Sequence, residues 1–221
     1  MRILIAFLLL LSAAGTQAQR VQTDTLLEYI QRQQYGEALA AVQNGAAVAE
    51  QDLPALLEYN SRTQLLREKP AGYHTTLELL DSLLARLRYY NGTDGVCTPL
   101  GYAIANGDSS MVRILLAKGV HTGADNIVHI GYDLTAFQYA AFRYPARQYP
   151  AEGLAVLRLL QASGADVSAA TLVPFQTHVS HSKNIDLPAG ANALDIAIAS
   201  GAPAEVVSYL RALGLKEMAG K

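Results

Sequence analysis

The stretch TPLGYAIANGDSSMVRILLAKGV, residues 98–120, predicts two short helices joined by a tight turn. Thr98 can cap free backbone N–H groups at a helix start, and Pro99 fits the first helical position. Residues 106–108 end this helix, because the glycine among them accepts a left-handed conformation. The residues expected to face inward are Leu100, Ala103, Ile104, Val112, Leu115 and Leu116, and Gly119 ends the second helix. Two such helices cannot bury their apolar faces alone, so they need similar neighbours.

Similar helix pairs recur along the chain. Residues 134–142 repeat the first helix, and 151–169 repeat the second helix with Gly164 at its end. Both helices return within 192–214, where Gly201 occupies the turn. A looser copy lies near the N-terminus, and a further copy with lengthened helices follows it. The five predicted repeats span about 24–48, 52–90, 98–120, 134–167 and 192–214.

This pattern resembles the ankyrin repeat, with its T-P-L-x-x-A-x-x-x-G and V-x-x-L-L-x-x-G-A-D signatures. The resemblance implies an all-α fold, an ankyrin-repeat helical solenoid of about five repeats that occupies 19–221 as one domain. The family usually has His after T-P-L, whereas Gly101, Gln138 and Asp195 stand there in this chain. We therefore expect the hydrogen bonds that this His makes between repeats to be absent or replaced.

Three insertions lengthen the connections between the predicted helices. They span 121–133, 144–150 and 168–190. In a stacked array, insertions map to one face, which is often the binding face. We therefore expect 121–133 and 168–190 to lie close together despite their separation in sequence.

The first 18 residues have the features of a secretory signal peptide. Arg2 precedes an apolar run that is too short to cross a bilayer, and small residues lead to an expected cleavage before Gln19. Without Arg2, 16 basic and 19 acidic residues remain, a net charge of −3 that does not suit nucleic-acid binding. Cys97 is the only cysteine, so packing rather than disulfides must hold the fold. These features favour a bacterial periplasmic protein without an integral membrane anchor.

Catalytic motifs are lacking. The chain has no nucleotide-binding fingerprint and no G-x-S-x-G elbow beside Ser180. His178 and His181 form H-x-x-H, and His129 in the neighbouring insertion, with Asp125 or Asp186, could complete a metal site. The default interpretation of these side chains is a polar surface. We therefore expect no enzyme activity and no cofactor, and a metal-binding or enzymatic role of the loop 168–190 remains an alternative.

Tyrosine and arginine gather in and around the insertions, and both residue types are enriched at binding hot spots. The residues predicted to form one partner-binding site are Tyr132, Arg143, Tyr144, Phe175 and His178. Leu115 and Leu159 are predicted instead to be buried and to stabilise the fold. Tyrosine used only to fill the core is the competing interpretation.

The resemblance also suggests a function. Ankyrin-type proteins with export signals resemble immunity proteins, which neutralise effectors delivered into the bacterial periplasm, lipases among them. The leading hypothesis is therefore an inhibitor that sequesters a toxic effector enzyme by covering its active face. A housekeeping periplasmic ankyrin scaffold linked to stress defence is the alternative within the same class.

Overall fold

The computed structural model describes residues 26–63, 72–87, 97–122, 127–129, 132–143, 150–180 and 183–218, and it is mostly helical. The chain divides into two compact units, Met1–Tyr59 with Lys69–Tyr90 and Asn60–Glu68 with Asn91–Lys221. Each unit is described by itself, and the single array of five repeats stays a prediction. The expected signal peptide, 1–18, and Tyr144 lie outside the described residues.

The first unit contains the helical residues 26–31, α2 (Tyr35–Gln43), the beginning of α3 (Asp52–Thr63) and α4 (Tyr73–Arg86). Leucines spaced three or four residues apart form one face of α4, which packs against α2. The larger apolar side chains buried in this unit include Leu26, Ile30, Leu53, Leu56, Leu57, Leu79, Leu80 and Leu83.

In the second unit, α5 (Pro99–Asn106) and α6 (Ser109–Ala117) form the helix pair predicted from residues 98–120. The Thr98 hydroxyl accepts a hydrogen bond from the Gly101 N–H at 3.1 Å, and Gly107 ends α5 with φ 66°. Of the residues expected to face inward, Leu116 alone is half-buried, and the other five are buried.

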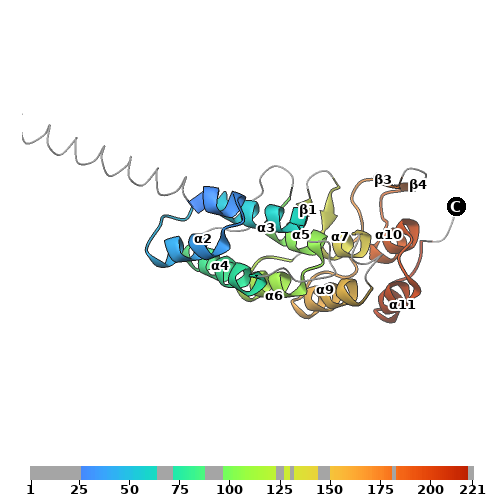
Figure 1. The fold of residues 1–221 in the computed structure, drawn as a ribbon. Coiled ribbons are helices and arrows are strands. Elements are labelled where there is room, and N and C mark those ends of the chain that lie inside the picture. The colour runs from blue at the N-terminus through green and yellow to red at the C-terminus, as the bar shows by residue number, and fades with distance from the viewer. Residues whose placement is uncertain are drawn as a thin grey trace, which may run out of the picture. The chain divides into compact units, whose positions relative to one another are not determined.

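Two further helix pairs follow, α7 (Ala136–Phe142) with α9 (Pro150–Ala162) and α10 (Ala193–Ser200) with α11 (Ala204–Ala212). The first helices α5, α7 and α10 contact one another in sequence order, as do α6, α9 and α11. The unit therefore has two rows of helices (Figure 1). Leu115 is fully buried between them as predicted, whereas Leu159 is only half-buried, and the buried face of α9 consists of Val156, Leu157 and Leu160.

The side chains of Gln138 and Asp195 connect successive parts of this unit. Gln138 closes a capping box with Thr135 and donates a hydrogen bond from Nε2 to the Ala169 carbonyl at 3.0 Å. Asp195 likewise closes a capping box, and its Oδ1 accepts a hydrogen bond from the Met218 N–H at 2.8 Å. Gln138 and Asp195 therefore each bond to a residue beyond their own helix, whereas Gly101 has no side chain to do so.

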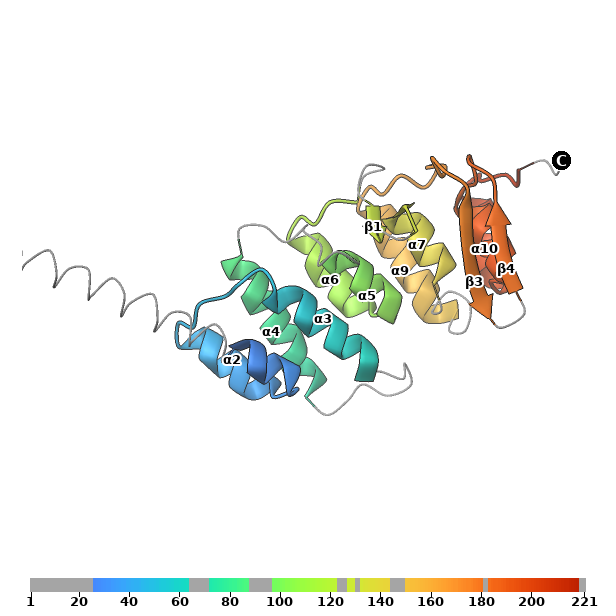
Figure 2. The same cartoon turned by 90° about the horizontal axis from the view of Figure 1, so that it is seen from above.

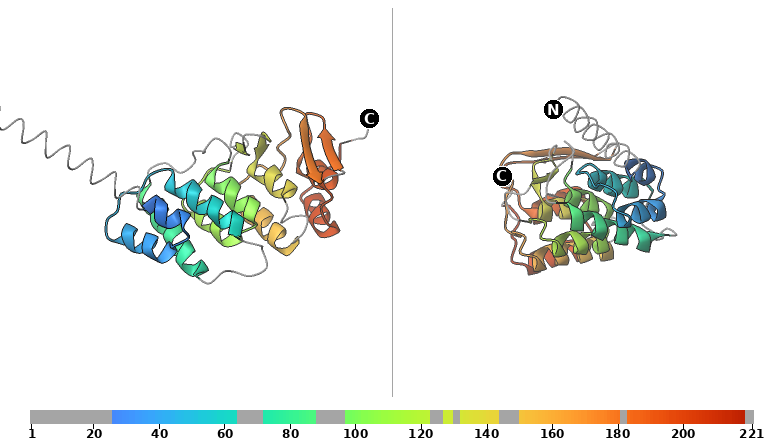
Figure 3. Two further views of the ribbon diagram at one scale, coloured as in Figure 1. Left: turned by 45° about the horizontal axis from the view of Figure 1, so that its top comes forward. Right: turned by 90° about the vertical axis from the view of Figure 1, so that its left-hand side faces the viewer.

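Two antiparallel hairpins depart from the all-α prediction. Within the insertion 121–133 and just after it, β1 (Ile127–His129) pairs with β2 (Leu134–Thr135). Within 168–190, β3 (Phe175–Ser180) pairs with β4 (Lys183–Leu187). These strands form because apolar and polar residues alternate along the segment, as Phe175 and Gln176 illustrate. β1 contacts α7 and β4 contacts α10 (Figure 2), and the β3–β4 hairpin lies on the side of α10 away from α11 (Figure 3).

Candidate partner-binding site

An aromatic cluster joins the two insertions that contain the hairpins. The Tyr132 ring, from 121–133, lies 6.0 Å from the Phe175 ring, from 168–190, measured between centroids. Phe142 at the end of α7 lies 5.2 Å from Tyr132 and 5.3 Å from Phe175, and all three contacts are edge-on. The expectation that these insertions lie close together is therefore confirmed, and the edge-on geometry is one that aromatic pairs prefer.

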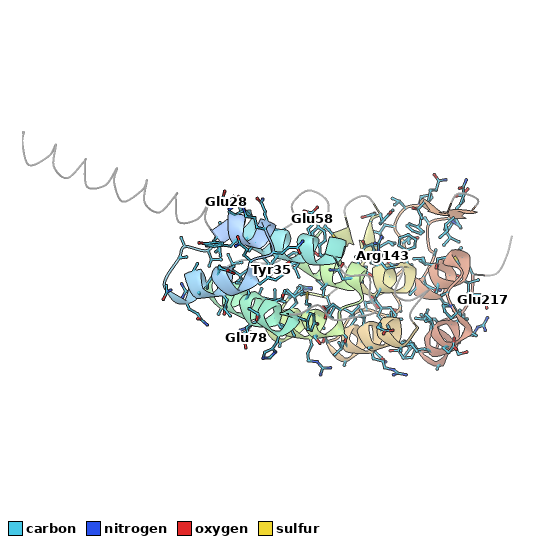
Figure 4. The ribbon with its side chains drawn as sticks, in the orientation of Figure 1. Glu28, Tyr35, Glu58, Glu78, Arg143 and Glu217 are labelled. Carbon is cyan, nitrogen blue, oxygen red and sulfur yellow. The ribbon has the colours of Figure 1, made fainter. Side chains whose placement is uncertain are left out.

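Arg143, labelled in Figure 4, follows α7 directly and is next to Phe142 of this cluster in the chain. Its guanidinium carbon lies 5.3 Å from the centroid of the Tyr139 ring, which makes a cation–π contact. Tyr139 is 2% exposed, and burial raises the pKa of its hydroxyl, with the Arg143 charge acting in the opposite direction. Tyr139 is therefore a neutral structural residue that supports Arg143.

Tyr132 is half-buried in the turn before β2. The next residue, Asp133, has φ 50°, a left-handed conformation that costs a residue other than glycine about 1–2 kcal/mol. Asp is among the residues that tolerate it. The strain therefore lies beside an aromatic residue that the sequence analysis assigned to the partner site, and strained backbone is often found at binding sites.

Phe175 is 2% exposed, so its ring is not available to a partner protein. The sequence analysis placed it at the partner surface because it lies in a polar insertion. The structure instead places it among Tyr132 and Phe142, where it holds the start of β3 against the helices. Phe175 therefore positions the neighbouring residues and makes no direct partner contact.

Leu172 and Val173, which precede Phe175, are exposed apolar residues that the sequence analysis missed. Leu172 is 83% exposed and Val173 is 47% exposed, and we call this pair the apolar tip. The letters TLVPF contain the signal, since two adjacent apolar residues stand directly before a proline within the insertion. Their exposure was not predictable without knowing that the flanking residues are buried.

Backbone hydrogen bonds fix the base of the apolar tip. The Thr171 N–H donates to the Ala191 carbonyl at 2.8 Å, and the Gly190 N–H donates to the Thr171 carbonyl at 2.8 Å. The Thr171 hydroxyl also accepts from the Ala191 N–H at 3.1 Å. Buried Thr171 and buried Phe175 therefore hold the tip from both sides.

The outer face of the β3–β4 hairpin is polar. Gln176 and Asp186 are exposed register partners, and Gln176 Nε2 donates to Asp186 Oδ1 at 3.0 Å. His178 pairs with Asn184 in the backbone register. An open hollow of about 380 Å³ is lined by Gln176, Thr177, Asn184, Ile185 and Asp186.

The alternative of a metal site rests on residues that the structure does not describe. These are Asp125 and the side chains of His129, His178 and His181. Among the described residues, no group of three or more His, Cys, Asp and Glu side chains could hold a metal ion. Cys97 is 2% exposed, which fits the expected role of a small buried residue. In the same part of the chain, no helix is long and apolar enough to cross a membrane.

No known family model matches this chain, and no curated protein matches its sequence.

Proposed function

We propose that this chain is an exported, non-catalytic ankyrin-repeat protein that binds another protein through its insertions. Support for the ankyrin class comes from three helix pairs in the second unit, which contact one another in two rows. Left-handed glycines, Gly107 and Gly201, occupy the turns of the first and last of these pairs. Gln138 and Asp195 take the position of the family histidine and make bonds beyond their own helices. Repeat proteins use such stacks to present binding surfaces.

The observation that carries the binding role is the exposure of the apolar tip on a fixed base. An 83% exposed Leu172 loses contact with water when a partner covers it, which favours association. Because Thr171 and Phe175 are buried on either side, the tip is already ordered before it binds. Preorganisation lowers the entropy cost of association, so these residues suit a protein contact.

Within this class, the function that we propose is inhibition of a toxic effector enzyme, such as a lipase, in the bacterial periplasm. The signal-like N-terminus provides the route to that compartment, and the resemblance to immunity proteins provides the type of partner. The inhibitor acts by covering the active face of the effector. Binding therefore blocks the entry of substrate without a catalytic group on the inhibitor.

The test uses the toxic hydrolase encoded by a gene adjacent to this one. The hydrolase is purified and assayed on phospholipid vesicles or a soluble ester, with and without residues 19–221 of this chain. We expect a stoichiometric complex and loss of hydrolysis at equimolar inhibitor. An adjacent gene that encodes no toxic hydrolase, or full hydrolysis at saturating protein, overturns the inhibitor proposal and favours the stress-related scaffold.

The double variant Leu172→Ala/Val173→Ala tests the surface itself. Losing two anchors at a hot spot costs about 2 kcal/mol or more, which weakens binding to the hydrolase roughly thirtyfold. Because both side chains are exposed, the midpoint of thermal unfolding should not change. The matched control is Met218→Ala, which truncates another apolar side chain, 39% exposed, in the C-terminal segment. Equal binding by the double variant and this control contradicts the proposed surface.

A further inference from the structure

Arg143 carries a positive charge that no acidic residue among those the structure describes balances. Within the part of the chain that the structure describes, no Asp or Glu oxygen forms an ion pair with it. The residue is half-buried, and its Nε atom is buried without a hydrogen-bond partner. A partly desolvated charge that lacks a counter-charge is unfavourable, so an incoming anion is favoured at this position.

We propose that Arg143 is a subsite for a carboxylate, namely an acidic side chain of the partner protein that contacts the Tyr132 side of the insertions. This inference rests on the proposed protein-binding function and specifies the chemistry of the partner. An acidic residue with apolar neighbours would place its carboxylate on Arg143 and its neighbours on the exposed aromatic and aliphatic side chains nearby.

The local geometry fixes the guanidinium before the partner arrives. The guanidinium carbon lies 5.3 Å from the centroid of the Tyr139 ring. The backbone N–H of Arg143 donates to the backbone carbonyl of Tyr139 at 3.0 Å, at the end of α7. The carboxyl end of a helix favours a cation, and stacking on a ring restrains the guanidinium plane. Less side-chain entropy is therefore lost when an anion binds.

The burial of individual atoms determines the direction of approach. Nε is buried, whereas neither Nη group is among the buried atoms without a partner and neither bonds to a residue that the structure describes, so both reach the solvent. A carboxylate can therefore accept one hydrogen bond from each Nη group of the guanidinium, because the planar carboxylate matches the planar guanidinium in geometry. Approach at the Nε side is excluded.

The single positive charge of Arg143 and the aromatic rings near it favour the carboxylate of an acidic side chain as the bound anion. A monovalent carboxylate balances a single guanidinium, and the stem of an Asp or Glu side chain can contact an aromatic edge. Half-buried Tyr132 lies 6.2 Å, between centroids, from Tyr139, the ring on which Arg143 stacks, and supplies such an aromatic surface. The apolar tip is close to the same cluster, since Leu172 is three residues from Phe175, a span of at most about 11 Å.

The experiment needs no effector, so its failure is distinguishable from failure of the inhibitor proposal. Residues 19–221 labelled with ¹⁵N-arginine are titrated with the peptide acetyl-Leu-Phe-Asp-Leu-Gly-amide and with its Asn counterpart. The Arg143 Nε–H resonance reports on the site because this group is buried. We expect saturable shifts with the Asp peptide and at least about tenfold weaker binding of the Asn peptide, the effect of one charge-assisted contact.

Three variants make the assignment specific. Arg143→Gln should bind both peptides equally weakly, and Arg143→Lys should bind the Asp peptide several-fold more weakly than the parent, because an ammonium lacks the flat fork. Arg113→Gln removes an exposed arginine from α6 and is the matched control, with unchanged affinity. The circular dichroism spectrum and melting temperature of each variant verify folding, and Arg143→Lys remains informative if Arg143→Gln unfolds.

The proposal is overturned if the Asp and Asn peptides bind alike, if neither binds, or if Arg143→Gln binds the Asp peptide as the parent does. Inorganic phosphate is titrated in parallel. Displacement of the Asp peptide by phosphate at equal concentration would indicate a general anion site and would also overturn the assignment to a protein carboxylate.

Discussion

Lowering the pH from 8 to 5 is expected to stabilise the unit that contains Asp52. This residue begins α3 and is 0% exposed. Its Oδ2 accepts a hydrogen bond from the Ala49 N–H at 2.8 Å, whereas its Oδ1 is buried without a partner. Burial raises the pKa of the Asp52 carboxyl from 3.8 to about 6, and the Ala49 bond acts in the opposite direction. The charged form is therefore the costly one in the folded state.

The sign follows from proton binding. Between about pH 4 and pH 6 the folded state binds the Asp52 proton more tightly than the unfolded state, so stability rises as the pH falls through this window. The stability gained by protonating Asp52 is fully present below the pKa of the unfolded state and is absent well above the pKa of the folded state. The separation of the two pKa values corresponds to at most about 3 kcal/mol, with a slope of up to about 1.4 kcal/mol per pH unit.

The variant Asp52→Asn removes this titration, and the assay compares pH dependences rather than absolute stabilities. Urea unfolding of residues 19–221 is followed by circular dichroism from pH 8 to pH 4.5 for the parent, for Asp52→Asn and for Glu37→Gln. Glu37 is an exposed carboxylate in the same unit and serves as the control. The parent and Glu37→Gln should gain stability on acidification relative to Asp52→Asn. Parallel curves for the parent and Asp52→Asn would refute the reasoning.

Four further substitutions test the packing of the second unit by urea titration at pH 7. Leu115→Ala should lower the free energy of unfolding by about 2–5 kcal/mol, because Leu115 is fully buried. Leu159→Ala should lower it by less than half of that value, because Leu159 is only half-buried. Equal losses would contradict the assignment of buried and outer faces to these helices. Gln138→Ala should cost about 2 kcal/mol, since it removes the bonds to Thr135 and to the Ala169 carbonyl. Gly201→Ala should cost about 1–2 kcal/mol because φ is 79° there, and an unchanged midpoint would dispute that conformation.

The helices could be predicted because their signals are local. A capping hydroxyl at Thr98, a proline at the next position and a glycine at Gly107 act within one or two turns of the same helix. The apolar spacing then determines which side is buried, as at Leu115. Leu116 and Leu159 were placed less well, because a half-buried residue at the edge of an apolar stripe depends on how closely the neighbouring helix approaches.

The hairpins and the exposure of individual side chains were harder to predict. The alternation in 175–187 was present in the sequence, but it lay inside a segment interpreted as an insertion between repeats. Phe175 and Leu172 are both apolar and only three residues apart, yet one is buried and the other is exposed. Which of them faces the helices depends on the register of the hairpin and on the position of Tyr132, which are tertiary properties.

The insertion 168–190 shows how a helix stack can hold an exposed apolar tip in place. Its chain departs and returns at one point, where Thr171 bonds to Gly190 and Ala191 just before α10 begins. The residues between these ends are therefore constrained by the stack, although few of them contribute to it. Substitutions at the apolar tip can change partner affinity without affecting the helix pairs, whereas substitutions at Thr171 should affect both. The separation of binding from stability thus follows from the closure of the loop at its base.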